Sequence, residues 1–182
     1  SDHEKLQEKH QEKLQEKLQE SETSHQLPVL ETAKNSDGKV TTKVSLFYPG
    51  FRGRETIMMR VNRSVEGAVN PKRALELIQK GPLYLEKGLV NPFDASIKVE
   101  DLIIQNNEAK VYISKSMHQM SAIVRQDRLD QLCLTLFQFK EIKSIRIFID
   151  GIEVDQLGKG KDAIRLHQPI QNSSQRIVEN FK

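Results

Sequence analysis

The 182-residue sequence has little of several residue types that build common functional sites. Its single cysteine, Cys133, excludes an internal disulfide and any zinc site made of several cysteines. Tryptophan is absent, and aromatic residues make up only 5% of the chain. No apolar run approaches the roughly 18 residues of a membrane-spanning helix, which excludes such a helix within these residues. The first residue is Ser1 rather than Met, so the sequence leaves open whether a signal or an anchor precedes it.

The five histidines do not form a metal-binding pattern. Three of them stand in the polar N-terminal region, whereas His118 and His167 are isolated. No pair has the spacing of two ligands on one helix turn. Cys133 follows the apolar periodicity of a helix, which favours a buried structural thiol over a reactive one. We therefore expect no metal site and no cofactor.

Two other patterns resemble catalytic motifs only superficially. Asp127 and Asp130 alternate with Arg125 and Arg128, and this charge pattern predicts a solvent-exposed helix face with salt bridges. The segment 158–162, Gly-Lys-Gly-Lys-Asp, lacks the leading glycine and the following Ser or Thr of a phosphate loop, so it predicts a flexible surface turn. We expect no catalytic residues and no enzymatic activity.

The N-terminal residues 1–22 contain a repeat of the type Glu-Lys-Leu-Gln, which favours a charged helix. Its apolar positions recur every four residues rather than in heptads, which predicts a solvated spacer or stalk. A weakly self-associating helix is the alternative. Residues 23–40 have the composition of a linker, a domain is predicted for residues 41–168, and residues 169–182 form a polar tail that we expect to fray.

Hydrophobic periodicity within 41–168 predicts five strands and two helices. The elements are expected, in chain order, as strands 44–48 and 57–61, a helix 70–80, strands 97–104 and 109–113, a helix 121–140 and a strand 145–149. Asn70-Pro71 is a helix-start signal, and Asn106-Asn107 fits a tight hairpin turn. We predict an α+β fold in which a small mixed or antiparallel sheet carries both helices on one face, in the order β-β-α-β-β-α-β.

One charged cluster stands out in a chain whose formal net charge is +3. The basic residues of this cluster are Arg52, Arg54, Arg60, Arg63, Lys72 and Arg73. Such a set is either an ordinary solvated face or a docking surface for an acidic subunit or an anionic envelope polymer, since arginine binds carboxylate and phosphate well. No aromatic stacking set or recognition helix accompanies the charge, so nucleic acid is not an expected partner.

Several short motifs follow one another along the predicted domain: the strand end Leu46-Phe47-Tyr48-Pro49, the segments 77–82 (LIQKGP) and 87–92 (KGLVNP), and the strand and turn 145–151 (IRIFIDG). In this order they resemble the GerMN domain family of sporulation and spore germination proteins. The resemblance covers about residues 42–168. It implies an extracytoplasmic domain tethered to a bacterial membrane, similar to the ring-building modules of envelope complexes, and it implies no catalysis.

Together these patterns predict a non-enzymatic domain of the cell envelope that mediates protein–protein assembly, with self-association as one form. A membrane tether would lie outside the sequence given. The alternative is a binding module for an anionic envelope ligand, such as a glycan, another polymer or a lipid headgroup, that uses the Arg-rich segment.

Overall fold

The structure is a computed structural model that describes residues 2–13 and 30–182. Residues 2–13 are helical, which agrees with the charged N-terminal helix predicted from the repeat. The rest of the repeat and residues 23–29 of the predicted linker lie outside the described residues. In the two described ranges, no helix is both long enough and apolar enough to cross a membrane.

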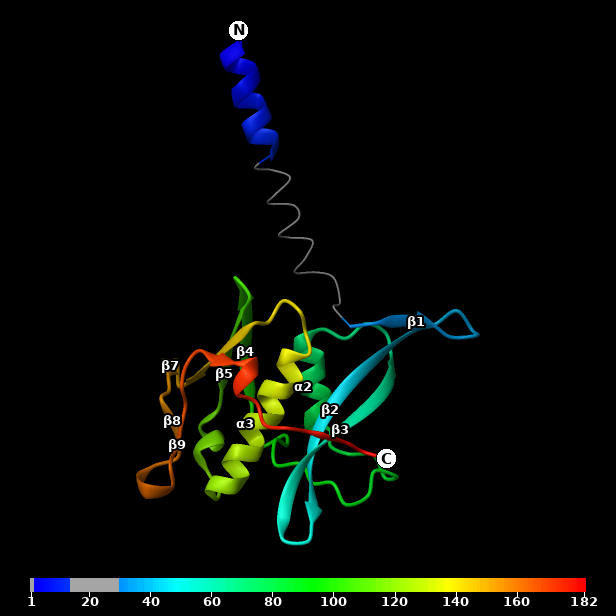
Figure 1. Ribbon diagram of the computed structural model, residues 1–182, viewed down its shortest axis with the longest axis vertical. Helices are drawn as coiled ribbons and strands as arrows, with labels where there is room; N and C mark the ends of the chain where they lie inside the picture. Colours follow the sequence, from blue (N-terminus) through cyan, green and yellow to red (C-terminus); the bar gives the residue numbers. More distant parts are fainter. Residues whose placement is uncertain (1, 14–29) are drawn as a thin grey trace.

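Two long strands form a twisted ribbon. Strands β2 (Val40–Arg52) and β3 (Glu55–Glu66) pair antiparallel without a register shift. The short strand β1 (Thr32–Lys34) pairs with the start of β2, and β11 (Glu179–Asn180) runs parallel to β3. These four strands make up sheet A, and Figure 1 shows the C-terminal segment lying along the ribbon.

A second sheet, sheet B, is built around three strands. Strands β4 (Val99–Gln105) and β5 (Glu108–Ile113) form the predicted hairpin, and β6 (Ser144–Ile149) pairs parallel to β5. Asn106 and Asn107 both have positive φ, 52° and 61°, as a tight hairpin turn requires. The asparagine signal in the sequence is therefore confirmed.

Short strands complete the far edge of sheet B. Both β7 (Ile152–Glu153) and β10 (Ile170–Gln171) pair antiparallel with β6. A separate small hairpin joins β8 (Gln156–Leu157) to β9 (Ile164–Arg165). Strands of two residues carry no periodic pattern, so the periodicity of the sequence does not predict them.

The two main helices begin at the residues that the sequence indicates. Helix α2 (Pro71–Gln79) is capped by Asn70, and helix α3 (Ala122–Phe137) is capped by Ser121. Each cap accepts a hydrogen bond from the backbone N–H three residues later, at 2.8 Å for Asn70 and 3.4 Å for Ser121. Three short 3-10 turns, η1 to η3, cover Lys115–His118, Gly160–Asp162 and Asn172–Ser174.

The core lies where the helices pack between the ribbon and sheet B (Figure 1). Side chains from all four parts are fully or almost fully buried there. They include Leu46 and Tyr48 of β2, Leu75 and Ile78 of α2, Val111 and Ile113 of β5, Leu132 and Leu136 of α3, and Ile145 and Ile147 of β6. The predicted apolar face of each helix is thus the one that faces the core.

The prediction of one sheet is wrong, although β2, β3, α2, β4, β5, α3 and β6 follow in the predicted order. The strands separate into two sheets because glutamine amides of α3 occupy part of the free edge of β2. Gln138 accepts from the N–H of Ser45 at 3.0 Å and donates to its carbonyl at 2.9 Å, and Gln131 donates to the carbonyl of Phe47 at 2.9 Å. These side chains replace a neighbouring strand, and the ring-building arrangement is not confirmed.

Candidate functional site

The outward face of sheet B carries aromatic and aliphatic side chains. Because side chains alternate along a strand, the register that buries Val111 and Ile147 turns Tyr112 and Phe148 outward. The rings of Tyr112 and Phe148 stack with centroids 4.7 Å apart. Ile103 of β4, which is 37% exposed, belongs to the same face. Aromatic residues of this kind are enriched in protein interfaces.

Charged side chains flank the stacked rings on this face. Arg146 lies between two carboxylates, at 3.1 Å from Glu108 and 2.7 Å from Glu153. Hydrogen bonds to Glu153 and Glu108 raise the pKa of Arg146 above its ordinary value. The face therefore offers a fixed pattern of charge beside an apolar centre, which is the arrangement that specifies a partner. At its margin, β4 pairs with β5, and no other strand of the described residues pairs with its second edge.

The six basic residues of the predicted docking surface occupy three separate places. Arg52 and Arg54 lie at the turn of the β2–β3 hairpin, Arg60 and Arg63 within β3, and Lys72 and Arg73 in the first turn of α2. Arg63 pairs across the ribbon with Val44, which is eight residues from Arg52 along β2. At about 3.3 Å per residue this separates them by roughly 26 Å, so all six cannot surround one small anion.

Residues of the C-terminal segment contact two of these arginines. Arg52 forms an ion pair with Glu179. The guanidinium of Arg60 lies 5.6 Å from the ring centroid of Phe47 and donates to Oδ1 of Asn180 at 3.4 Å. Both arginines therefore help to hold β11 on the ribbon.

Of the other four basic residues, two contact groups within the fold and two are exposed. Arg63 forms an ion pair with Glu86, and both side chains are only 12% exposed. Arg73 donates to a backbone carbonyl of the preceding loop at 2.7 Å. Arg54 and Lys72 are exposed. Binding of an anion by these six residues stays a prediction. Arg52 and Arg63 already form ion pairs within the fold.

Arg60 also borders a groove between the ribbon, α3 and the C-terminal segment. The groove is lined mainly by amide, hydroxyl and aromatic side chains: Ser45, Phe47, Arg60, Asn62, Leu134, Phe137, Gln138, Asn172 and Asn180. Of the six basic residues, Arg60 is the one that lines this groove.

The C-terminal residues, which we expected to fray, instead cross the molecule from sheet B to sheet A. Strand β10 pairs with β6, and the N–H of Phe181 donates to the carbonyl of Arg60 at 2.9 Å. Between these contacts, Nη1 of Arg176 lies 3.0 Å from Asp127 and 3.2 Å from Asp130 on α3. The polar composition predicted a tail that frays. Instead, backbone hydrogen bonds and the ion pairs of Arg176 hold this segment on the rest of the domain.

Asp127 and Asp130 are therefore not on a solvent face, contrary to the prediction. Their side chains are 5% and 7% exposed. Burial raises the pKa of Asp127 and raises that of Asp130 to about 6, although Arg176 opposes both shifts. The charged forms of these carboxyls depend on an arginine that lies more than 45 residues further along the chain.

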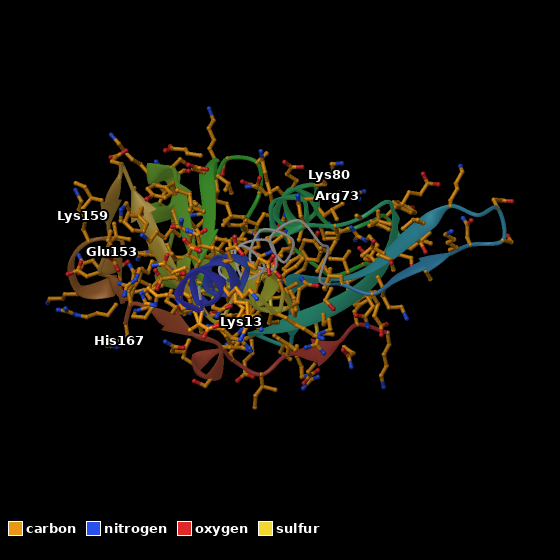
Figure 2. All side chains as sticks on the ribbon, turned by 90° about the horizontal axis from the view of Figure 1, so that it is seen from above. Lys13, Arg73, Lys80, Glu153, Lys159 and His167 are labelled. Carbon is orange, nitrogen blue, oxygen red and sulfur yellow. The ribbon has the colours of Figure 1, made fainter. Side chains whose placement is uncertain are left out.

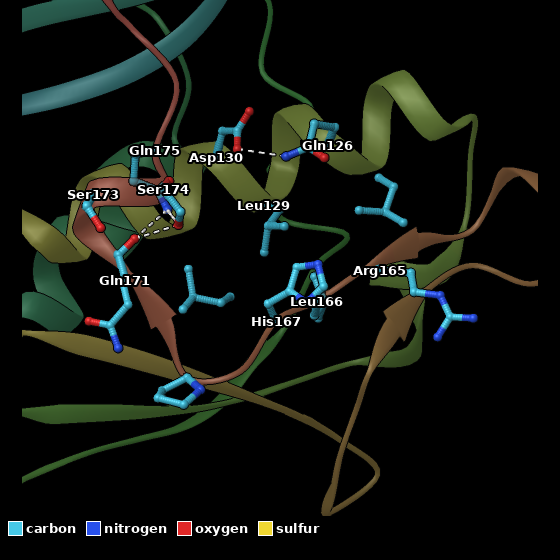
Figure 3. A pocket seen from close by; sticks show the side chains of 13 residues that line it. Gln126, Leu129, Asp130, Arg165, Leu166, His167, Gln171, Ser173, Ser174 and Gln175 are labelled. Carbon is cyan, nitrogen blue, oxygen red and sulfur yellow. Dashed lines mark hydrogen bonds between the residues drawn. The ribbon is translucent and has the colours of Figure 1, made fainter.

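Asp130 also reaches a pocket of about 330 Å³ between α3 and the C-terminal segment (Figure 3). The lining consists of Gln126, Leu129, Asp130, the residues 164–167 and 169–171, and Ser173 to Gln175. Gln126 donates to Oδ1 of Asp130 at 2.9 Å. Across the described ranges, no group of three acidic, histidine or cysteine side chains is placed to hold a metal ion.

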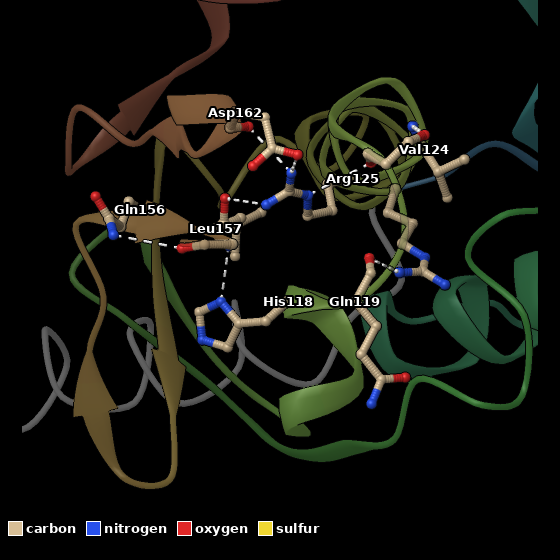
Figure 4. A network of polar contacts seen from close by, with 10 residues as sticks. His118, Gln119, Val124, Arg125, Gln156, Leu157 and Asp162 are labelled. Carbon is tan, nitrogen blue, oxygen red and sulfur yellow. Dashed lines mark hydrogen bonds and ion pairs between the residues drawn. The ribbon is translucent and has the colours of Figure 1, made fainter. Parts of the chain in front are cut away.

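Arg125 and Arg128 are also buried rather than exposed, and neither pairs with the neighbouring aspartates. Arg125 donates to the carbonyl of Leu157 at 2.9 Å and to the carbonyl of Asp162 at 3.0 Å, and it forms an ion pair with the Asp162 side chain (Figure 4). Arg128 donates to backbone carbonyls of residues 92, 116 and 119. Both arginines bind loops to α3.

The segment 158–162 lies at the surface with residues 159–162 exposed, whereas Gly158 is buried against Arg125. Gly158 has a φ of 84°, and a side chain there would collide with the guanidinium of Arg125. The N–H of Gly158 donates to Nδ1 of His118 at 3.0 Å (Figure 4). Burial is the main cause that lowers the pKa of His118. These contacts are consistent with a structural role for His118.

Cys133 is fully buried, and burial raises the pKa of its thiol far above the ordinary value. A thiol in that state is not a nucleophile at neutral pH. The prediction of a structural thiol is confirmed.

Solved structures with this fold come from a sporulation protein. The chain is similar to the tandem GerMN domains of GerM from Bacillus subtilis, with 16% identity and a TM-score of 0.56, covering 78% of this chain and 48% of that one. It is also similar to the first GerMN domain of the same protein, with 15% identity and a TM-score of 0.55, covering 73% of this chain and 99% of that one. The chain thus spans about half of the tandem structure and matches a single domain.

No curated protein matches the chain. Residues 45–155, more than half of the sequence, match the family described as Germane, sporulation and spore germination. They contain the strand ends, the loop after α2 and the last long strand that carried the resemblance in the sequence. The chain therefore belongs to the GerMN (Germane) family.

Proposed function

We propose that this protein is a non-enzymatic domain of the bacterial cell envelope that assembles with protein partners, further copies of itself among them. The family description names sporulation and spore germination and no catalytic activity. The observation that carries the proposal is the outward face of sheet B, with the stacked Tyr112 and Phe148 beside Ile103.

This face has the features of a docking surface. The aromatic pair provides an apolar centre of the kind that dominates binding energy in interfaces. Arg146 with its two glutamates supplies directional polar groups at the side. In this proposal the domain works outside the cytoplasm, and a membrane tether would lie beyond the residues given.

The test removes the apolar centre without touching the core. We expect the double substitution Tyr112→Ser and Phe148→Ser to weaken association by at least about thirtyfold, which corresponds to ~2 kcal/mol. Light scattering over a range of concentrations measures self-association, and crosslinking in cells measures capture of partners.

Ile123→Ser is the matched control, because Ile123 is 66% exposed on α3 and lies outside sheet B. It should leave association unchanged. If the double variant associates as well as the unsubstituted protein, sheet B is not the interface and the proposal fails.

A second function rests on the groove beside Arg60. Its amide, hydroxyl and guanidinium groups can donate to the oxygens of an anionic glycan or another phosphorylated envelope polymer. Binding should weaken with salt and fall on Arg60→Ala, while Lys72→Ala outside this groove changes little. Binding that is independent of salt, or equal losses in both variants, would remove this alternative.

A further inference from the structure

Three consecutive apolar side chains protrude from the loop that follows α2. Leu83, Tyr84 and Leu85 are 56%, 87% and 83% exposed. A run of exposed apolar residues is unusual on a protein surface that faces water unless the run has a function. Neither the predicted docking surface nor the outward face of sheet B includes these residues.

The protruding turn is held in one conformation. The N–H of Glu86 donates to the carbonyl of Leu83 at 2.9 Å, and the carboxylate of Glu86 accepts from the N–H of Leu83 at 2.7 Å. The same carboxylate forms the ion pair with Arg63, where both side chains are 12% exposed. These contacts fix the backbone of the turn in a conformation that exposes Tyr84 and Leu85. A turn that is already fixed loses little conformational entropy when it binds.

The loop is also fastened to the hairpin end of the ribbon. The N–H of Val90 donates to the carbonyl of Pro49 at 2.9 Å, and Leu89 bridges to Gly50. Figure 1 shows the loop beside the turn of β2 and β3. Phe51, at the end of β2, is 63% exposed and extends the apolar character of this end of the molecule.

The charge around the turn is positive. Lys87 lies with Nζ 5.5 Å from the ring centroid of Tyr84, and Lys80 precedes the turn at the end of α2. Glu86 is already paired with Arg63. Figure 2 shows Lys80 projecting outward on the α2 side, away from Lys159 and Glu153. Lys80 and Lys87 therefore stand on either side of the apolar run in the sequence, and the carboxylate of Glu86 is neutralised by Arg63.

We propose that the turn Leu83–Lys87 inserts into the surface of an anionic phospholipid bilayer. Tyrosine beside leucine suits the interfacial region, where the ring lies among headgroups and the aliphatic side chains reach the acyl boundary. Lys80 and Lys87 would bind lipid phosphates while their methylene chains cover apolar surface. The two lysines beside the exposed apolar side chains favour an anionic lipid surface over a protein partner. This inference is independent of the assembly face on sheet B.

The absence of tryptophan makes a direct test simple. Tyr84→Trp places the only tryptophan at the corner of the turn, and Ile123→Trp places it on an exposed site of α3. Each full-length variant is mixed with vesicles of phosphatidylcholine alone or with about one third phosphatidylglycerol. We expect a blue shift of the emission for Tyr84→Trp with anionic vesicles, quenching by brominated lipid, and neither effect for Ile123→Trp.

Cosedimentation with the anionic vesicles tests the contributions of the apolar side chains and of the lysines separately. We expect Tyr84→Ser with Leu85→Ser to reduce binding at least about tenfold, because two apolar side chains leave the interface. Lys80→Glu with Lys87→Glu should abolish the preference for anionic lipid. The proposal is overturned if the emission of the Tyr84→Trp variant does not shift at millimolar lipid, if both reporters respond alike, or if only an envelope protein shifts it. Loss of self-association through sheet B would leave these results unchanged.

Discussion

The two helices of the core bury different kinds of side chain. The buried residues of α2 are all apolar: Pro71, Ala74, Leu75 and Ile78. Those of α3 include six polar or charged residues: Arg125, Asp127, Arg128, Asp130, Gln131 and Thr135. Both helices have a capping residue at the expected position, so the difference lies in what they pack against rather than in how they begin.

The comparison shows two ways of fixing a helix in a small domain. Helix α2 needs only an apolar surface against it. Helix α3 needs specific partners, because a buried charge without one costs several kcal/mol. Its partners come from the loops around residues 92 and 116–119, the turn 157–162 and Arg176. The second half of the domain is therefore organised around polar groups of one helix.

The largest effect should come from Arg125, whose side chain is 2% exposed. Arg125→Ala leaves the carbonyls of Leu157 and Asp162 without their donor, and at about 1–3 kcal/mol for each carbonyl we expect a loss of about 2–5 kcal/mol in the free energy of unfolding. Urea denaturation followed by circular dichroism measures it. Arg73→Ala on α2, which removes one hydrogen bond near the surface, should lose about 1 kcal/mol or less.

Equal losses in the two variants would contradict the comparison between the helices. If Arg125→Ala does not fold, Arg125→Lys provides the test instead. Lysine keeps the charge but lacks the planar guanidinium that donates to both carbonyls. The stability of the Arg125→Lys variant should therefore lie between those of Arg125→Ala and the unsubstituted protein.

A medium effect should appear as a dependence on pH. The folded-state pKa of Asp130 is about 6, above the ordinary value of 3.8. Between these values the folded protein holds a proton that the unfolded chain releases, so this group's contribution to stability falls as pH rises from about 4 to 6. Above about pH 6 the ionised carboxylate depends on Arg176.

We therefore expect Arg176→Ala to lose about 1–2 kcal/mol at pH 8 and much less at pH 4.5, where Asp130 is protonated. Chemical denaturation at both pH values gives the difference. Arg165→Ala is the control, since Arg165 is exposed at the rim of the pocket and forms no ion pair within the described residues. A loss for Arg176→Ala that is the same at both pH values would show that Arg176 acts by packing rather than by charge.

The sequence was sufficient where the signal is local. The cap at Asn70, the start of a helix near Ser121, the Asn106–Asn107 turn and the apolar helix faces all depend on neighbours within a few positions, and the structure confirms them. The family resemblance was also confirmed. Local chemistry determines such features because capping and turn conformations involve only nearby backbone groups.

The sequence failed where a residue's partner is distant in the chain. Arg125 and Asp130 were assigned to an exposed, salt-bridged face because the charged side chains of a helix usually lie on its solvent side. Instead, Arg125 pairs with Asp162 and Asp130 with Arg176. The exposed turn at Tyr84 was missed for a similar reason: its anchoring ion pair joins Glu86 to Arg63 of β3. No local pattern encodes these contacts.

The smallest effect should separate the two caps. Asn70 accepts its hydrogen bond at 2.8 Å, whereas Ser121 accepts at 3.4 Å, near the limit for such a bond. We expect Asn70→Ala to lose ~1 kcal/mol and Ser121→Ala to lose less, about 0.5 kcal/mol. Thermal and urea unfolding of both variants measure the difference. A larger loss for Ser121→Ala would mean that the start of α3 is coupled to Arg125, whose backbone N–H donates to the carbonyl of Ser121 at 3.0 Å. The polar helix would then be less tolerant of substitution than the apolar one even at its end.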